Sequence, residues 1–485
     1  MKRKGILMMV LLVATLNMAA QEEEVMMRGR IENVTDYSSM PSLAREGLRK
    51  VGSLAAAPLT NMGSPRVPVI LVQFPDKPFT VRETEEDVHQ VYHEHFNASE
   101  GVCPGTSRWS VREFFRMQSD EQFTPDFDVI GPVTLSKSYT YYGQDQGKSR
   151  DIHIQEFYRE ACQQAILHDV DWSLYDNDKN GVVDFVFFIY AGQGQNQEGT
   201  EKGAIWPKES VSRFTVTGDG FNVSFGASGC TCELYLKEMD GIGACIHELS
   251  HGLGLPDFYD YNYKGYGMDY WDLMDSGCYK LHGRQPIGFS AYELEFLGWR
   301  QMVELTPDSA YSLTIDPLEK GGVAYKVVNK ANPDEYFILE NRQDIGVDNY
   351  MGYIVYSQYT THGPNHGLMI THVNYSKSAW ESNTVNTIDP SRQRFTIVPA
   401  DGELIPAFER SDDVWAESAH GDLYPGPNNV TEISSYAVFK GGTLGQTIDN
   451  IEEHKDGTIT LDINGGKPII EPEDPNVEPD IPEIA

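Results

Sequence analysis

Apolar residues in the first three hundred positions of this chain follow two alternating patterns. Continuous apolar runs occupy 67–74 and 185–190, which is typical of buried strands. Around them, apolar residues recur every three or four positions in 81–96, 110–116 and 151–168, which predicts amphipathic helices. Strands that alternate with helices in this way indicate a domain built from both kinds of element.

The pattern changes near residue 300. A helix at 288–299, ended by Gly298, closes the first domain, which we place at 66–300. Beyond it, short segments of alternating apolar and polar residues are separated by turn residues, which favours an all-β, sandwich-like domain over 301–465. The segments expected to form its strands are 311–315, 323–328, 336–340, 367–373, 395–398 and 457–462.

The two ends of the chain differ in composition from these domains. Residues 1–20 contain basic residues, then an apolar stretch and a small-residue cleavage site, the pattern of a secretory signal peptide. The apolar stretch is shorter than the roughly 20 residues that a membrane span needs. We therefore expect a secreted, periplasmic or cell-surface protein. Residues 21–65 are expected to be a pro-segment or a linker, and residues 466–485, rich in Pro and Glu, a disordered tail.

Length and charge restrict the partners of the protein. The chain has 485 residues, of which 40% are hydrophobic, a composition typical of folded domains. Its formal net charge is −34, and loss of Lys2, Arg3 and Lys4 with the signal peptide would make it −37. Such a charge disfavours nucleic acids and anionic membrane surfaces as partners.

The strongest chemical signal is a group of His, Glu and Asp residues that precedes the last helix of the first domain. His247, Glu248 and His251 have the H-E-x-x-H spacing, which on a helix puts both imidazoles on one face. Two imidazoles with an open position suit zinc, and a catalytic zinc site needs a third protein ligand. Gly254 can end the helix sharply with a positive φ, so that the chain turns back and offers Asp257. Glu248 is then placed to act as general base on a water.

In these residues the sequence resembles the metzincin clan of zinc endopeptidases, whose extended motif is H-E-x-x-H-x-x-G-x-x-H/D. More narrowly, the continuation Leu-Pro-Asp-Phe-Tyr-Asp to residue 260 resembles the immune inhibitor A family of secreted bacterial metalloproteases. Segments 336–342 and 422–426 also resemble that family, so the likeness covers about 66–465. The resemblance implies an α+β fold, in which a metzincin-like catalytic domain with a mixed sheet and an active-site helix precedes the all-β domain. It also implies a secreted zinc-dependent endopeptidase that hydrolyses peptide bonds of extracellular proteins through a metal-activated water.

The resemblance also suggests roles for residues around the motif. Metzincins place a Met in a tight turn beneath the zinc, and Met274 matches that element. Some place a Tyr two residues later as a transition-state stabiliser, but Ser276 stands there, and Tyr279 is the candidate replacement. Zincin sites hold the substrate backbone by strand addition to an edge strand, and the segments 204–207 and 221–225 are candidates for that strand.

A second candidate metal site lies before the apolar run at 185–190. Oxygen-bearing side chains alternate there and Gly181 supplies a sharp turn, as in the first nine positions of an EF-hand calcium loop. Phe187 stands where an EF-hand has its bidentate Glu, so an acidic turn without metal is the alternative. The residues that would hold a structural Ca²⁺ are Asp176, Asp178, Asn180 and Asp184.

Five further histidines are not expected to bind the catalytic metal, and a cysteine-rich metal site is not expected either. We expect His93 and His95 to lie at the surface, because they do not have helical ligand spacing. His362, His366 and His372 fall in the β-rich half and are interpreted as non-catalytic. Six cysteines permit disulfides in an exported protein, but their pairing does not follow from the sequence; they are Cys103, Cys162, Cys230, Cys232, Cys245 and Cys278.

A rival interpretation belongs to another functional class. The protein would be a non-catalytic cell-surface or glycan-binding protein on a zincin scaffold. Glu248 argues against it, because a purely structural zinc site needs no general base. The sequence therefore favours a protease whose partners are protein or peptide substrates, with Zn²⁺ as catalytic cofactor and Ca²⁺ as structural cofactor.

Overall fold

The computed structural model describes residues 58–466, with internal gaps at 100–106, 148, 167–169, 198–199, 211–212, 219–220, 236, 263, 350–353, 357–358, 362–365, 390 and 406–417. The expected signal peptide, most of the expected linker or pro-segment, and the expected tail lie outside the described residues, as do Cys103 and His362. Among the residues described, no helix is both long and apolar enough to cross a membrane.

The first half of the chain is built on a seven-stranded sheet with the order β2-β1-β3-β6-β4, in which β5 and β7 also pair with β6. β1 pairs in parallel with β2 and β3, and β3 in parallel with β6, whereas β4, β5 and β7 run antiparallel to β6. The strands are β1 Arg66–Gln73, β2 Asp126–Thr134, β3 Val183–Gln193, β4 Lys208–Ser210, β5 Phe214–Gly218, β6 Phe221–Tyr235 and β7 Glu238–Met239.

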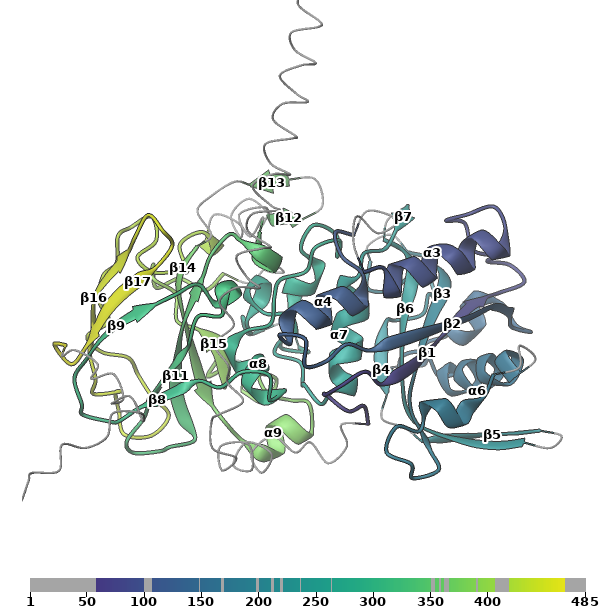
Figure 1. The fold of residues 1–485 in the computed structure, drawn as a ribbon, viewed down its shortest axis with the longest axis horizontal. Coiled ribbons are helices and arrows are strands. Elements are labelled where there is room, and N and C mark those ends of the chain that lie inside the picture. Colours follow the sequence, from purple (N-terminus) through teal and green to yellow (C-terminus); the bar gives the residue numbers. More distant parts are fainter. Residues whose placement is uncertain are drawn as a thin grey trace, which may run out of the picture.

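Helices cover both faces of this sheet because its central strands are apolar on both sides (Figure 1). Alternate residues of β1 divide between two clusters: Val69 and Leu71 pack with α3, α4 and α7, and Ile70 and Val72 pack with α6. The helices are α3 Glu85–Asn97, α4 Val111–Gln118, α5 Tyr139–Tyr142, α6 Ile154–Ala165, α7 Gly243–Gly252, α8 Ala291–Phe296 and α9 Lys377–Glu381.

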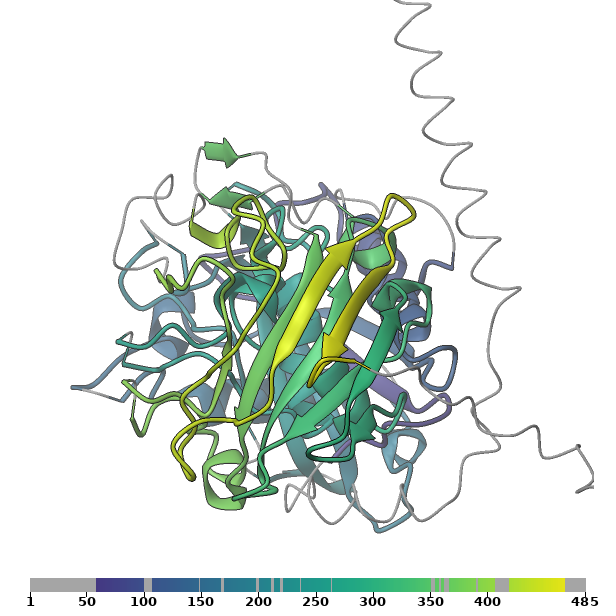
Figure 2. The same ribbon diagram turned by 90° about the vertical axis from the view of Figure 1, so that its left-hand side faces the viewer.

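The second half of the chain contains two further sheets that share one apolar cluster, as Figure 2 shows from their end of the molecule. A five-stranded sheet has the order β15-β14-β11-β10-β8, and a three-stranded sheet has the order β16-β17-β9. Their strands are β8 Val303–Leu305, β9 Tyr311–Ile315, β10 Tyr325–Val328, β11 Glu335–Arg342, β14 Gly367–Asn374, β15 Phe395–Ile397, β16 Ile448–Glu453 and β17 Ile459–Ile463, while β12 Ile354–Tyr356 and β13 Tyr359–Thr361 form a separate pair.

The two halves are joined by a continuous core. One face of the five-stranded sheet packs against the three-stranded sheet. Its other face carries Met369 and Phe395, which belong to the same apolar cluster as α7. Phe258, next to the predicted ligand Asp257, stacks on Phe395 with ring centroids 3.9 Å apart. The change of pattern near residue 300 therefore marks a change of sheet rather than a gap in the core, and α7 lies between the two halves (Figure 1).

Several elements differ from the sequence prediction. Residues 204–207 form no strand, and the strand begins instead at Lys208. β2 was not expected, because Gly131 and Pro132 are residues that sequence patterns exclude from strands. The expected helix at 288–299 is regular only over the six residues of α8, which starts at a capping box formed by Ser290 and Glu293.

The expectation that His95 lies at the surface is wrong. His95 is only 2% exposed, whereas His93 is exposed. His95 is buried because it lies on the same face of α3 as Val91 and Tyr92. Its ring packs edge-on against Tyr92 and Phe96. Burial lowers the pKa of His95 to about 4, so the imidazole is neutral inside the fold. The five cysteines that are described, Cys162, Cys230, Cys232, Cys245 and Cys278, are buried and free.

Candidate active site

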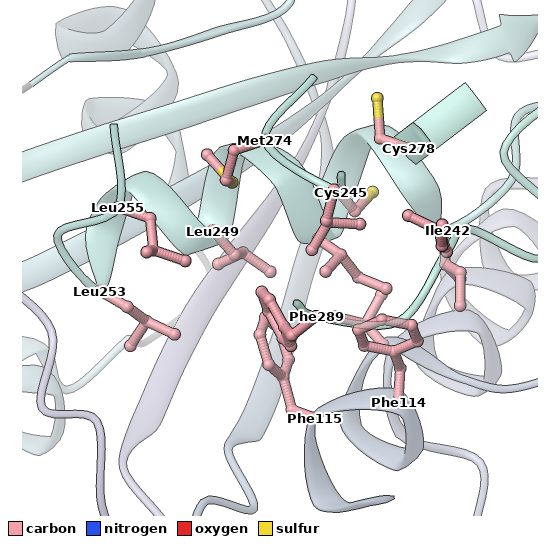
Figure 3. Packing of buried hydrophobic residues seen from close by; sticks show 14 of the residues in the cluster. Phe114, Phe115, Ile242, Cys245, Leu249, Leu253, Leu255, Met274, Cys278 and Phe289 are labelled. Carbon is pink, nitrogen blue, oxygen red and sulfur yellow. The ribbon is translucent and has the colours of Figure 1, made fainter. Parts of the chain in front are cut away.

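The helix α7 carries the predicted site and is buried on almost every side. Its N-terminal end is held against the turn at Cys278, because a Cβ placed on Gly243 would lie 1.8 Å from the Cys278 carbonyl oxygen. Figure 3 shows Phe114, Phe115 and Phe289 packed on one side of the helix and Met274 on another. The helix is therefore fixed in rotation, which fixes the direction of the side chains on its remaining face.

Both imidazoles of α7 are oriented by backbone carbonyl groups. His247 Nδ1 lies 2.9 Å from the carbonyl oxygen of Leu273, and His251 Nδ1 lies 2.8 Å from that of Leu255. A carbonyl oxygen only accepts, so each Nδ1 is the donor and each Nε2 keeps its lone pair. This second hydrogen bond is what metal-binding histidines commonly make, and it presents both Nε2 atoms to the same space.

The chain returns to that space after the helix. Gly254 has φ +101°, a backbone conformation that residues with a Cβ avoid, and the turn it makes brings Asp257 back to the imidazoles. Asp257 Oδ1 lies 3.1 Å from His247 Nε2 and 3.2 Å from His251 Nε2, yet it is buried without a hydrogen-bond partner. Ligands of tetrahedral zinc are about 3.3 Å apart when the metal bonds are about 2.0–2.1 Å long. The three atoms therefore fit one divalent cation.

The second oxygen of Asp257 is held by two residues that sequence reasoning missed. Asp257 Oδ2 accepts hydrogen bonds from the Tyr261 hydroxyl at 2.5 Å and from Asn383 Nδ2 at 2.7 Å. Asn383 Oδ1 also accepts from the backbone N–H of Asp257 at 2.6 Å. The Tyr-rich loop after Asp257 offered a signal that a tyrosine such as Tyr261 lies near the site. Nothing in the sequence links Asn383 to Asp257, because the two residues are 126 positions apart.

Burial and charge set the protonation of the carboxyl groups in this region. Burial alone would raise the pKa of Asp257, but His251 and His247 together hold it well below its ordinary value. Burial raises the pKa of Glu248, which is 7% exposed, and the two imidazoles oppose this effect. Glu209 on β4 has its pKa raised by burial to about 7, partly opposed by His251. Asp257, Glu248 and Glu209 are thus close enough to influence one another's charge and that of the imidazoles.

The structure places Met274 and Tyr279 on the turn beside α7. Met274 is fully buried in the apolar cluster of the helix, and its carbonyl oxygen accepts a hydrogen bond from the backbone N–H of Phe258 at 2.9 Å. Leu273, one residue earlier, supplies the carbonyl that orients His247. The Tyr279 hydroxyl accepts a hydrogen bond from Asn196 Nδ2 at 3.1 Å, and Glu248 is one of the charges that act on it. This turn therefore contacts the helix from the side of the site.

The second predicted metal site forms a compact loop. Oxygens of Asp176, Asp178 and Asp184 lie within 4.8 Å of one another, and Gly181 has φ +85°. Asn180 is turned inward on the loop: its Oδ1 accepts from the backbone N–H of Val182 at 2.9 Å. The loop thus brings its three predicted carboxylate ligands together, and Asn180 hydrogen-bonds to two of them, Asp176 and Asp178.

Two imidazoles from one helical turn, a carboxylate returned by a glycine turn, and a buried Glu next to the first His in sequence have the residue types and spacing of a metallopeptidase site. Residues 57–302, about half of the chain, match the family model described as immune inhibitor A peptidase M6, catalytic domain, and the chain belongs to this family. The family predicted from the sequence is thereby confirmed.

Curated relatives agree with this assignment. The chain is 28% identical over 308 residues to the pre-pro-metalloprotease PrtV of Vibrio cholerae serotype O1, a match that covers 56% of this chain and 33% of the relative. It is 25% identical over 285 residues to immune inhibitor A of Bacillus thuringiensis subsp. alesti, covering 50% of this chain and 41% of the relative. The chain thus spans well under two thirds of the length of either relative.

Proposed function

We propose that this protein is a zinc-dependent endopeptidase that acts on protein substrates outside the cytoplasm. The observation that carries the proposal is the convergence of His247, His251 and Asp257, whose ligand atoms lie within 4.8 Å of one another. Asp257 Oδ1 lies 3.1 and 3.2 Å from the two Nε2 atoms, close to the separation of ligands on a tetrahedral zinc. The pattern of residues 1–20 supports export. We further propose that the first domain is metzincin-like and that the two sheets sharing a core in the second half form a β-sandwich.

In this proposal, each residue of the site has a separate task. His247, His251 and Asp257 hold the metal, which when bound polarises the scissile carbonyl and lowers the pKa of its water. Glu248 takes the proton from the attacking water and passes it to the leaving amine. Burial raises the pKa of Glu248 from its ordinary value, which brings it nearer to that of a group able both to accept and to release a proton near neutral pH.

We place the substrate backbone along β4. This strand ends the sheet order and runs antiparallel to β6, and it contacts α7. An extended peptide that pairs with its outer edge would pass in front of the helix. Met274 would then support, from the apolar cluster of α7, the residues that hold the metal, and Tyr279 would donate a hydrogen bond to the substrate oxygen on which charge develops.

We also propose a structural calcium ion in the loop of Asp176, Asp178 and Asp184. The proximity of the three carboxylates supports this proposal. Burial raises the pKa of Asp184, and the charges of Asp178 and Asp176 raise it further. A bound cation would relieve this repulsion. Asn180 Oδ1 accepts a hydrogen bond from the backbone N–H of Val182 and keeps a second lone pair that could coordinate such an ion.

The rival function, a glycan-binding or cell-surface protein without catalysis, predicts a different outcome in one experiment. Casein hydrolysis is measured on the purified protein, then after removal of metal with a chelator, and again after addition of Zn²⁺. A protease loses activity with the chelator and regains it with zinc. Stoichiometric zinc without hydrolysis of casein or of any peptide in a broad library would support the rival.

A further inference from the structure

Glu209 occupies a position on the edge of the main sheet that the proposed mechanism does not use. It is the central residue of β4, which pairs with residues 228–230 of β6. Within the described part of the chain, no strand pairs with the other side of β4. Glu209 therefore lies on the strand along which we place the substrate.

The register of β4 gives the direction of this side chain. Glu209 is opposite Gly229, and a Cβ on Gly229 would lie 3.0 Å from the rings of Phe185 and Phe187. Those rings belong to the apolar cluster that includes α7. Because directly opposed residues point to the same face of a sheet, Glu209 points to the α7 side. Its neighbour Lys208 alternates to the other face, where its ammonium group pairs with Asp151.

Among the residues described, no Lys or Arg side chain forms an ion pair with the carboxyl group of Glu209. Its Oε1 is buried and has no hydrogen-bond partner there, and the charges acting on it come from His251, Glu248 and Asp257. Once a zinc ion is bound between neutral imidazoles, the two carboxylates of Glu248 and Asp257 balance its charge. The buried carboxyl group of Glu209 then ionises only at a cost, and a cationic ligand beside it would favour the ionised form.

We propose that Glu209 is a specificity-determining residue, which binds the cationic side chain of a substrate Lys or Arg beside the scissile bond. A substrate residue opposite Glu209 in an added antiparallel strand would point to the same face, about 5 Å away between Cβ atoms. An oppositely charged pair at that distance is favourable, and the more so where water is excluded. The inference rests on the proposed endopeptidase function and names its substrate class.

The experiment uses the zinc-loaded full chain and one internally quenched peptide series. Each position flanking the scissile bond carries in turn Arg, the neutral norleucine, or Glu. We expect wild type to prefer Arg over norleucine at one position by about tenfold to a hundredfold in kcat/KM, the range of a charge-assisted hydrogen bond. Glu209→Gln should abolish this ratio, because kcat/KM should fall far more for the Arg peptide than for the norleucine peptide. Glu209→Lys should prefer Glu at the same position.

Controls separate this role from others. Glu238→Gln removes a carboxylate on the same sheet whose side chain is 70% exposed, and it should keep the Arg preference. Zinc content and melting temperature of each variant test whether the site has remained intact. Equal losses on all peptides in Glu209→Gln, or an Arg preference that survives it, would overturn the proposal, as would a wild type that cleaves norleucine and Arg peptides equally. A wild type that cleaves none of them refutes the endopeptidase function instead.

Discussion

Asn383 clamps Asp257 by both ends of its amide group. Its Nδ2 donates to the Asp257 carboxylate at 2.7 Å, and its Oδ1 accepts from the Asp257 backbone N–H at 2.6 Å. Since Oδ2 is engaged in this way, Oδ1 is left to face the two imidazoles. Asn383 belongs to the β-rich half of the chain and Asp257 to the helix-containing half. The candidate metal site is therefore completed by a residue outside the matched family region of 57–302.

The first prediction concerns this clamp. Asn383→Ala should lower zinc affinity by about tenfold to a hundredfold, the usual effect of removing a hydrogen-bonding partner of a metal ligand. Affinity is measured by competition with a chromogenic chelator. Asn429→Ala is the matched control, because both asparagines have φ +52° but Asn429 makes no hydrogen bond to the site residues among those described. Unchanged affinity in Asn383→Ala would mean that the clamp is incidental.

The second prediction tests the third ligand. Asp257→Ala should lose zinc, because it removes the only carboxylate that closes the group with His247 and His251 in the described structure. Asp260→Ala should keep zinc and lower the melting temperature instead, because Asp260 accepts hydrogen bonds from the backbone N–H groups of Asn262, Lys264 and Gly265. Metal analysis of both variants decides the matter, and equal zinc contents would point to another ligand.

The third prediction separates metal binding from proton transfer. Glu248→Gln keeps the size of the side chain but cannot accept a proton. It should bind zinc as wild type does and lose roughly 10²–10⁴ in rate, the contribution of a general base. Rate is measured on one peptide at saturating zinc. Near-full activity in this variant would rule out Glu248 as the general base.

How many of the site residues could be predicted from the sequence depends on how far apart they lie along the chain. His247, Glu248, His251 and Asp257 lie within eleven positions, where helix periodicity and one glycine turn are enough to predict that they meet. Asn383 and Glu209 come from remote elements, and their proximity depends on how sheets pack and on strand register. Neither quantity can be derived from local periodicity.

Whether an element or a buried residue was predicted depended on how regular its apolar pattern is. Strands with a continuous apolar run, such as β3, were predicted because they are buried on both faces. β2 was missed because it mixes intermediate and buried residues and contains Gly131 and Pro132. His95 was misplaced because a polar residue on the buried face of α3 breaks the pattern by which buried faces are recognised.

The fourth prediction is a pH dependence of stability that arises from His95. Its pKa is about 4 in the fold and roughly 6.5 in an unfolded chain, so the unfolded state binds more protons between these values. Stability from the neutral imidazole is therefore present above pH 6.5 and is lost as pH falls toward 4. At pH 5 the loss is on the order of 2 kcal/mol.

Urea unfolding at pH 7 and pH 5, with chelator present throughout, measures this effect. His95→Phe removes the titrating group and keeps an aromatic ring among Tyr92 and Phe96, so the variant should lose less stability on acidification than wild type. His93→Phe changes the exposed neighbour on α3 and should titrate as wild type does. Identical pH dependence in all three proteins would show that His95 does not contribute.

The fifth prediction concerns calcium. Asp176, Asp178 and Asp184 hold their carboxylates within 4.8 Å, and the loop leads directly into β3 at the centre of the main sheet. A bound Ca²⁺ would stabilise the native state by about 2.7 kcal/mol at a hundredfold excess over its dissociation constant. Calcium should therefore raise the melting temperature of the zinc-loaded protein, and Asp178→Ala should abolish most of the rise. Mg²⁺ is the control ion, since it accepts a flexible cage of protein oxygens less readily. If calcium does not change the melting temperature of wild type, the loop is an acidic turn and calcium is not a cofactor.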